Sequence, residues 1–153
     1  MNDNESENID WAPVVPEFVV SDIAVSRRFY IDGLGFHVLF ERPEENFAYL
    51  NLGKVQIMLV QNRDDLTVAE ILGPQIPPFG VGGHLQIEVL DVDAMVDRLA
   101  ERGHSILKGP TDAWRRARDR EVGQREIWLQ DPDGYLLRFQ TDLGYRPLNH
   151  EFP

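Results

Sequence analysis

The apolar positions of the chain follow one order of elements twice. Alternating apolar residues predict strands, and apolar residues at a spacing of three or four predict helices. The first series has the strand VVPEFVV, a helix in SDIAVSRRFYIDGLGF, and the strands HVLFER, NFAYLNL and KVQIMLVQ. The second series has the strand HLQIEVL, a helix in DVDAMVDRLAERGH, the short strand SILKGP, a charged loop in DAWRRARDREVG, and two strands in REIWLQDPDGYLLRFQ. Each series predicts a β-α-β-β-β module.

The two predicted helices share the same kind of boundary. An Asp stands at the start of each, where its carboxylate can cap the first turn, and a Gly stands at the end. These pairs are Asp22 with Gly35 and Asp91 with Gly103. Such a repeat is typical of two modules that cannot bury their faces alone and pack against one another. The sequence therefore predicts an α+β fold built from two βαβββ modules.

Changes in composition along the chain predict five segments. A polar, acidic leader covers residues 1–12, and we expect it to be flexible. Residues 13–62 form the first module. Residues 63–82 form a linker, because its Pro and Gly residues break both helices and strand ladders. Residues 83–142 form the second module, and residues 143–153 form a C-terminal tail.

Composition and charge exclude several classes of protein. The chain of 153 residues contains no Cys, so it has no disulfide, no thiol nucleophile and no cysteine-ligated zinc. Fifteen Lys and Arg against 26 Asp and Glu give a formal net charge of -11, which argues against nucleic acid as a partner. The sequence has no apolar run long enough to cross a membrane and no signal-peptide pattern. We therefore expect a cytoplasmic protein without a membrane partner.

Two motifs resemble a known family. The pairing of SDIAVSRRFYIDGLGF near the start with DPDGYLLRF near the end resembles the vicinal oxygen chelate superfamily, which includes glyoxalases, extradiol dioxygenases and bleomycin resistance proteins. The resemblance covers about Pro13 to Gln140 and is closest to the bleomycin resistance proteins. It implies curved mixed sheets around a ligand cavity, paired in a homodimer. Whether the modules pair within one chain or exchange across a dimer stays open.

The resemblance also implies where a metal ion would bind. Metal enzymes of the superfamily hold their ion with four side chains, usually His, Glu or Gln. The matching positions in this chain are Val15, Met58, His84 and Arg138. Valine has no lone pair, a thioether is a soft ligand, and a guanidinium is a permanent cation. We therefore expect no metal ion and no other cofactor, and we interpret His84 as a pocket or core residue.

Strand alternation predicts which side chains line the cavity, because residues two apart leave the same face of a sheet. The former metal-ligand positions mark that face, and the opposite faces are aliphatic, as expected under helices. The predicted lining is acidic and aromatic, and Arg138 either pairs with Glu126 or Glu88 or stays free for a ligand. We expect ligand-binding roles for Glu17, Phe47, Tyr49, Met58, His84, Gln86, Glu88, Glu126, Trp128 and Arg138.

The leading functional hypothesis is a metal-independent binding protein without catalytic residues. By resemblance to the bleomycin resistance proteins, it would sequester a planar or cationic compound between aromatic side chains, as in antibiotic resistance. The positions of the drug-stacking tryptophans fall near Gln86 and Gly123 here, so Trp128, Trp114 or Tyr49 would have to replace them. This departure leaves bleomycin itself in question, and another aromatic or cationic molecule suits the residues equally.

Two alternatives belong to other classes. The first is a glyoxalase-type lyase or isomerase, or a dioxygenase-like enzyme, with an atypical site. Glu17, Glu88 or Glu126 would act as general base, and His84 or Arg138 would stabilise an oxyanion. Those carboxylates with His84 are also a conceivable unusual metal site. The second alternative is a domain that only mediates protein contacts, which would leave a polar-lined cavity without a purpose.

Overall fold

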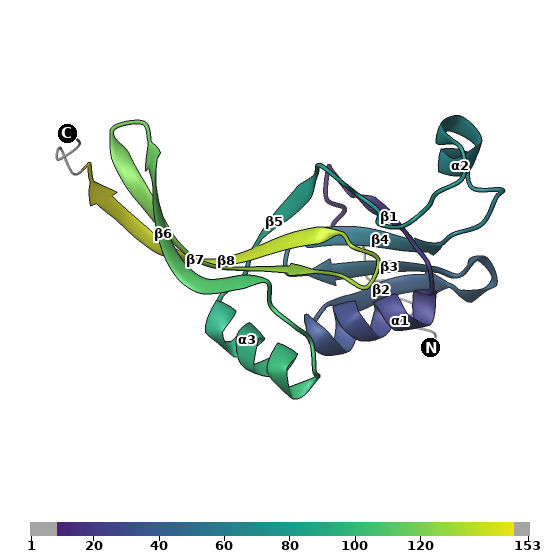
Figure 1. The fold of residues 1–153 in the computed structure, drawn as a ribbon, viewed down its shortest axis with the longest axis horizontal. Coiled ribbons are helices and arrows are strands. Elements are labelled where there is room, and N and C mark those ends of the chain that lie inside the picture. Colours follow the sequence, from purple (N-terminus) through teal and green to yellow (C-terminus); the bar gives the residue numbers. More distant parts are fainter. Residues whose placement is uncertain (1–8, 149–153) are drawn as a thin grey trace, which may run out of the picture.

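The structure, a computed structural model, describes residues 9–148 and contains the two predicted modules (Figure 1). The first module consists of β1 (Glu17–Val20), α1 (Ile23–Arg27) with its continuation η1 (Arg28–Gly33), β2 (His37–Arg42), η2 (Pro43–Glu45), β3 (Phe47–Leu52) and β4 (Val55–Gln61). The second consists of β5 (His84–Glu88), α3 (Val92–Glu101), β6 (Lys108–Ala117), β7 (Arg120–Gln130) and β8 (Leu136–Pro147). A helix α2 (Thr67–Leu72) lies between them. The α+β fold of two modules is confirmed.

The two sheets have the same strand order and the same register. Sheet A runs β1-β4-β3-β2 and sheet B runs β5-β8-β7-β6, with the first pair parallel and the others antiparallel in each. One row across sheet A joins Glu17, Met58, Tyr49 and Phe40. The equivalent row across sheet B joins Gln86, Arg138, Trp128 and Lys108, which we call the Trp128 row. Residues in one row leave the same face, so the repeat extends to single side chains.

One apolar core unites the two modules. The helices α1 and α3 lie on the same side of the molecule, below the sheets in Figure 1. The aliphatic sheet faces predicted from alternation pack against them in a single cluster. Its fully buried members include Ala48, Leu50, Ile57, Leu59, Ile127, Leu129, Leu137 and Phe139. Because burial in a helix-covered face selects aliphatic residues on every second position, this part of the sequence pattern predicted the core correctly.

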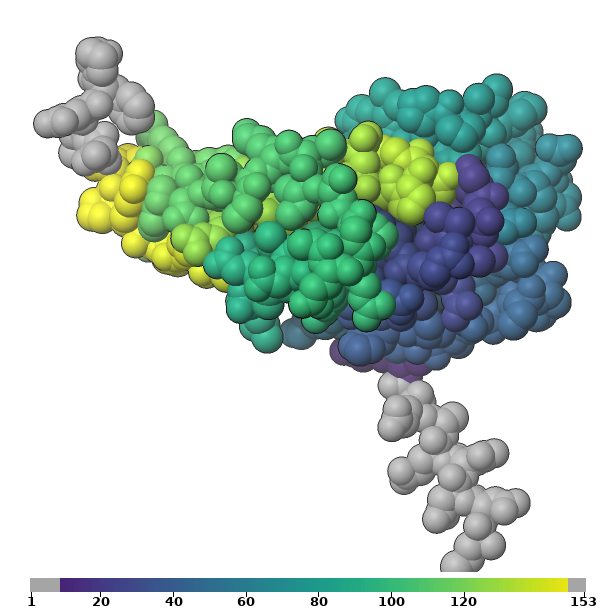
Figure 2. Space-filling view, turned by 60° about the horizontal axis from the view of Figure 1, so that its bottom comes forward, coloured from purple at the N-terminus to yellow at the C-terminus, as the bar shows by residue number. Residues whose placement is uncertain are grey.

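The Asp-Pro-Asp-Gly turn between β7 and β8 fastens the second module to the first. The Tyr30 hydroxyl donates to Asp131 at 2.8 Å, and the backbone N–H of Ser21 donates to Asp133 at 3.0 Å. Tyr135, just after the turn, stacks on Phe18 with the ring centroids 4.2 Å apart. Figure 2 shows the yellow-green turn directly against the purple and blue of the first module. The turn is therefore part of the junction between the modules.

Burial changes the proton affinity of the groups at this junction. Desolvation raises the pKa of Asp131 above its ordinary value of 3.8, although hydrogen bonds from Tyr30 and from the backbone of Tyr135 and Asp133 act in the opposite direction. Desolvation, with the nearby Asp131 and Asp133 charges, raises the pKa of Tyr135 to about 12. Ionising these groups is thus less favourable in the folded chain than in water.

Three segments differ from what the sequence pattern predicts. The stretch expected to be a charged loop forms most of β6 and the start of β7, joined at Arg118 with φ +61°. Residues 63–82 contain the helix α2, which the Pro and Gly residues around it concealed. Strand β8 continues to Pro147, past the expected module boundary at 142, so β6, β7 and β8 form an arm that projects away from the body (Figure 1). Within residues 9–148, no helix has the length and apolar character needed to cross a membrane.

Gly109, at the irregular start of β6, gives a test of the local backbone. It has φ +95°, and a side chain there would clash with the Glu126 carbonyl. We expect Gly109→Ala to lower the free energy of unfolding by about 2 kcal/mol in urea denaturation. The control is Gly53→Ala. Gly53 also has a positive φ, but no atom lies within 4 Å of the position that its Cβ would occupy, so this substitution should lower the free energy of unfolding by about 1 kcal/mol. Equal losses in the two variants would contradict the close approach.

Candidate functional site

The face of sheet A that points away from the helices is apolar, and other segments of the same chain cover it. Phe47 and Tyr49 are each 5% exposed, and they belong to one cluster with Val19, Val60 and Phe79. Leu66, Val68 and Ala69 from the α2 region pack on the same cluster, and so do Val15, Met58 and Tyr135. Glu17, at the end of its row, is exposed. Three of the four first-module candidates, Phe47, Tyr49 and Met58, are therefore packed within the chain.

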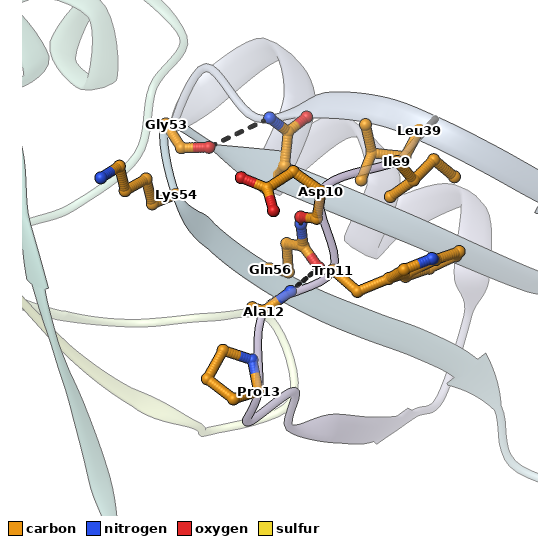
Figure 3. A pocket seen from close by; sticks show the side chains of 10 residues that line it. Ile9, Asp10, Trp11, Ala12, Pro13, Leu39, Gly53, Lys54 and Gln56 are labelled. Atoms are coloured by element: carbon orange, nitrogen blue, oxygen red, sulfur yellow. Dashed lines mark hydrogen bonds between the residues drawn. The ribbon is translucent and has the colours of Figure 1, made fainter. Parts of the chain in front are cut away.

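The segment before β1 lies over the edge of this face. Trp11 contacts Tyr49 edge-on with the ring centroids 5.4 Å apart. Gln56 accepts hydrogen bonds from the Ala12 backbone at 2.9 Å and the Tyr49 hydroxyl at 2.8 Å, and donates to the Asp10 carbonyl at 2.6 Å. A cavity of about 500 Å³ lies here (Figure 3). Its lining consists of Ile9, Asp10, Trp11, Ala12, Pro13, Leu39, Asn51, Gly53, Lys54 and Gln56, and contains none of the ten residues expected to bind a ligand.

The equivalent face of sheet B is polar and open. Gln86, Glu88 and His84 are exposed, and Trp128 is half-buried. The rings of His84 and Trp128 have centroids 4.9 Å apart, and the Arg138 guanidinium carbon lies 4.9 Å from the Trp128 ring centre. Arg138 also donates a hydrogen bond to Gln86. The structure therefore brings His84, Gln86, Trp128 and Arg138 together on one face, as alternation predicted.

Glu126 is the buried centre of this face. Its side chain is 2% exposed and accepts two hydrogen bonds from Arg115, at 2.7 and 3.0 Å. The Trp128 indole N–H donates to it at 3.3 Å, and Arg138 lies 3.7 Å away. Burial alone would raise the pKa of Glu126, but the hydrogen bonds from Arg115 and Trp128 and the charges of Arg115 and Arg138 outweigh it. The pKa is lowered from its ordinary value of 4.5, so Glu126 is ionised, and the cations Arg115 and Arg138 already compensate its negative charge.

Two buried polar atoms beside Glu126 have no partner within the described chain. They are the Nε of Arg138 and the Oε1 of Gln140. Both residues point from β8 to the face that carries Trp128, because they are two apart. Unpaired buried polar atoms are rare in native proteins, and such an atom commonly binds a ligand, an ion or a water molecule. This face therefore has hydrogen-bonding capacity that the protein itself does not use.

The candidates form two separate groups. Phe47, Tyr49 and Met58 lie in the sheet A cluster, whereas His84, Gln86, Glu126, Trp128 and Arg138 lie on sheet B. Among residues 9–148, no hydrogen bond, ion pair or ring contact joins one group to the other. Glu17 and Glu88 are exposed at equivalent edges of the two sheets. The single chain thus presents one filled face and one open face.

Two cationic residues of the open face were missed in the sequence. Arg115 holds Glu126, and Lys108 pairs with Trp128 across β6 and β7. Lys108 lies in the predicted short strand SILKGP, and Arg115 lies in the stretch expected to be a charged loop. Charged residues stand on both faces of this segment, so the sequence carried no alternation that would have placed Arg115 on the strand beside Glu126.

Sequence and structure comparisons agree with this geometry. The model of the Glyoxalase/Bleomycin resistance protein/Dioxygenase superfamily matches residues 12–139. The chain belongs to this superfamily. It is 29% identical over 129 residues to the uncharacterized protein YraH of Bacillus subtilis (strain 168), and the match covers 82% of this chain and 94% of that protein.

Several solved structures have the same fold. TioX from Micromonospora sp. ML1 aligns with a TM-score of 0.62 at 21% identity, covering 87% of this chain and 100% of that one. The virulence protein STM3117 from Salmonella typhimurium aligns with a TM-score of 0.60 at 24% identity, covering 88% and 98%. A glyoxalase/bleomycin resistance protein/dioxygenase from Nocardioides aligns with a TM-score of 0.60 at 18% identity, covering 95% and 93%. At these identities the likeness concerns the fold.

The metal site that the vicinal oxygen chelate superfamily implies does not fit the residues present. Val15 and Met58 are packed in the apolar cluster of sheet A, and the Arg138 guanidinium lies against Trp128 and Glu126. A divalent ion beside that guanidinium would meet a like charge, with His84 as the one ordinary ligand of the set. Across residues 9–148, no three His, Asp or Glu side chains are grouped closely enough to hold a metal ion.

Proposed function

We propose that this protein binds a planar small molecule directly, without a metal ion, on the face of sheet B that carries Trp128. The carrying observation is that Arg138, at a position where the superfamily places a metal ligand, lies over the Trp128 ring at 4.9 Å. Stacking of an aromatic ligand on the indole ring contributes about 0.5–1.5 kcal/mol to the binding free energy, in addition to the contribution of the buried apolar area. Binding without reaction corresponds to sequestration, the role that the resemblance to bleomycin resistance proteins suggested.

The structure supports the planar part of the expected ligand more than the cationic part. A cationic compound would need a free carboxylate near the aromatic plate. Glu126 is the carboxylate nearest Trp128, and its two oxygens already accept hydrogen bonds from Arg115. Glu17 and Glu88 are exposed but lie at the sheet edges.

A second copy of the chain would complete the site. Ligand cavities bury most of the surface of their ligand, whereas the Trp128 face is open in the single chain. We therefore keep the homodimer as part of the proposal, with the partner supplying the opposite wall. Sedimentation equilibrium should give twice the mass of 17.6 kDa at micromolar concentration. A strictly monomeric protein that still binds ligands would contradict this arrangement.

The alternative of a metal-free lyase or isomerase receives less support. A general base works best with a pKa near neutrality, and the pKa of Glu126 is lowered instead, because its pairing with Arg115 and Trp128 outweighs burial. Both Glu126 oxygens accept a hydrogen bond from Arg115, which makes the carboxylate a weaker base toward a substrate proton. Glu17 and Glu88 are exposed carboxylates with no described hydrogen bond to a catalytic partner. The binding function is therefore the better supported one.

Titration of intrinsic fluorescence with a broad panel of planar compounds, in excess EDTA, tests the proposal. We expect at least one compound to change the emission saturably, and Trp128→Leu to weaken its binding about tenfold. The matched control is Trp114→Leu, because Trp114 packs on Gly123 and under Arg146 on the arm. Affinity that Trp128→Leu leaves unchanged, or a panel without any saturable response, would refute the proposal.

A further inference from the structure

The Trp128 ring lies beside one carboxylate, Glu126, and its strand-pair neighbours in the Trp128 row are cations. In the Trp128 row, Trp128 on β7 pairs with Arg138 on β8 on one side and with Lys108 on β6 on the other. Directly paired residues on neighbouring strands have their Cβ atoms about 5 Å apart, so the side chains of Arg138 and Lys108 both start beside the indole plate. The equivalent row of sheet A has Met58 and Phe40 on either side of Tyr49. The duplicated module thus carries two charges on sheet B where sheet A is apolar.

Glu126, the carboxylate beside the Trp128 ring, does not cancel the positive charge there, because it faces both Arg115 and Arg138. Glu126 is held by two hydrogen bonds from Arg115, which itself contributes a third cation. Glu88 lies on β5, two strands away from Trp128, and Asp142 lies farther along β8 on the arm. A ligand lying on the Trp128 ring would therefore have Arg138 and Lys108 on either side of it and only a carboxylate that is already paired, although the whole chain has a net charge of -11.

Arg138 has donors to spare. Among the described residues it makes a single hydrogen bond, to Gln86, and its separation of 3.7 Å from Glu126 is too long for another. Its Nε is buried without a partner. A guanidinium presents its N–H groups in a planar fork that matches a carboxylate, and such paired, charge-assisted bonds are about twice as strong as neutral ones. Lys108 is exposed and can approach the same group from the other side of the ring.

We propose that the ligand of this site is a planar anion, an aromatic carboxylate or a compound of the same charge and shape, which stacks on Trp128 and places its anionic group at Arg138 and Lys108. This inference rests on the proposed function and names the ligand class. It replaces a planar cation, which would approach two like charges at that position. Arg138 would then supply, as a fixed guanidinium, a positive charge on the face where other members of the superfamily hold a metal ion.

Calorimetric titration with charge-matched ligands tests this choice. The series comprises benzene, naphthalene and anthracene scaffolds, each as the carboxylate, the neutral carboxamide and the aminomethyl cation, titrated into the full-length protein. On the best scaffold we expect the carboxylate to bind about tenfold more tightly than the amide, and the cation to bind more weakly than both. Arg138→Gln and Lys108→Gln should each remove most of the carboxylate's advantage over the amide, read as the ratio of the two affinities in the same variant. Lys108 is exposed, so its variant should fold normally.

The control variant is Arg28→Gln, an exposed arginine in η1, which should bind the carboxylate like the original protein. Equal affinity for the three members of a scaffold, or tightest binding of the cation, would overturn the planar anion and leave the proposed binding function standing. No binding of any member on any scaffold would overturn both. A preference for the carboxylate that survives both Arg138→Gln and Lys108→Gln would also overturn the assignment, because the anion would then be recognised elsewhere.

Discussion

Replacing Asp131 by alanine should lower the free energy of unfolding by about 4 kcal/mol, the largest loss that we expect from a single substitution. The Asp131 side chain accepts hydrogen bonds from the Tyr30 hydroxyl and from the backbone N–H groups of Asp133 and Tyr135, all in a buried setting. Removing it leaves three buried donors unpaired, and each costs about 1–3 kcal/mol. Urea unfolding measures the loss.

The control for this substitution is Asp119→Ala at the tip of the arm, where the side chain is 77% exposed and pairs only with its neighbour Arg120. Its effect should stay within about 0.5 kcal/mol. A small effect of Asp131→Ala would contradict the role of the Asp-Pro-Asp-Gly turn as the fastening between the modules.

The same site has a defined pH dependence. The pKa of Asp131 is raised by burial, so the folded chain binds this proton more tightly than the unfolded chain does. Its contribution to stability is fully present below the ordinary pKa of 3.8 and is lost as the pH rises through the higher pKa of the folded chain. Asp131→Asn lacks this titration. The stability of the original protein relative to Asp131→Asn should therefore decrease from pH 3 to pH 7, and an increase would contradict it.

Replacing Glu126 by alanine should lower the free energy of unfolding by about 3 kcal/mol. Glu126 is 2% exposed and lies between Arg115 and Arg138, and its loss leaves the largely buried Arg138 without a counter-charge. Arg115 is 45% exposed and can regain water, which places the loss at the lower end of what breaking a buried pair costs. Glu88→Ala, an exposed carboxylate of the same face, should change stability by less than about 0.5 kcal/mol.

The pH dependence of Glu126 has the opposite sign to that of Asp131. Its pairing with Arg115 and Trp128 outweighs burial and lowers its pKa. The stability that it contributes is therefore present above its ordinary value of 4.5 and is lost as the pH falls through the folded pKa. The difference between the original protein and Glu126→Ala, measured by urea unfolding, should shrink on acidification. A difference that grows toward low pH would contradict the ion pair.

Alternation predicted the core and one of the two candidate faces. Residues such as Leu50 and Ile127 had to be aliphatic because helices cover them, and the structure buries both. The same logic identified Gln86, Trp128 and Arg138 as neighbours on the opposite face, and the register joins them in one row. Local periodicity was sufficient here because both faces belong to regular strands.

Long-range contacts could not be predicted in the same way. The sequence pattern did not show that residues 66–69 and Phe79 would cover Phe47 and Tyr49, because Pro and Gly residues predicted a linker without helices or strands. Nor did it show that Asp133 reaches Ser21, a contact between residues far apart in sequence. Arg115 was missed because the arm carries charged residues on both faces, which removes the alternation that reveals a strand.

We propose that the site binds an organic ligand with its own side chains and needs no metal ion. The most direct test is calorimetric titration of the tightest planar ligand in excess EDTA and again with one equivalent of Zn²⁺, Ni²⁺, Mn²⁺ or Fe²⁺. We predict the same affinity in every case, with the same dependence on Trp128. Binding that disappears in EDTA and returns with one equivalent of a metal ion would contradict the account.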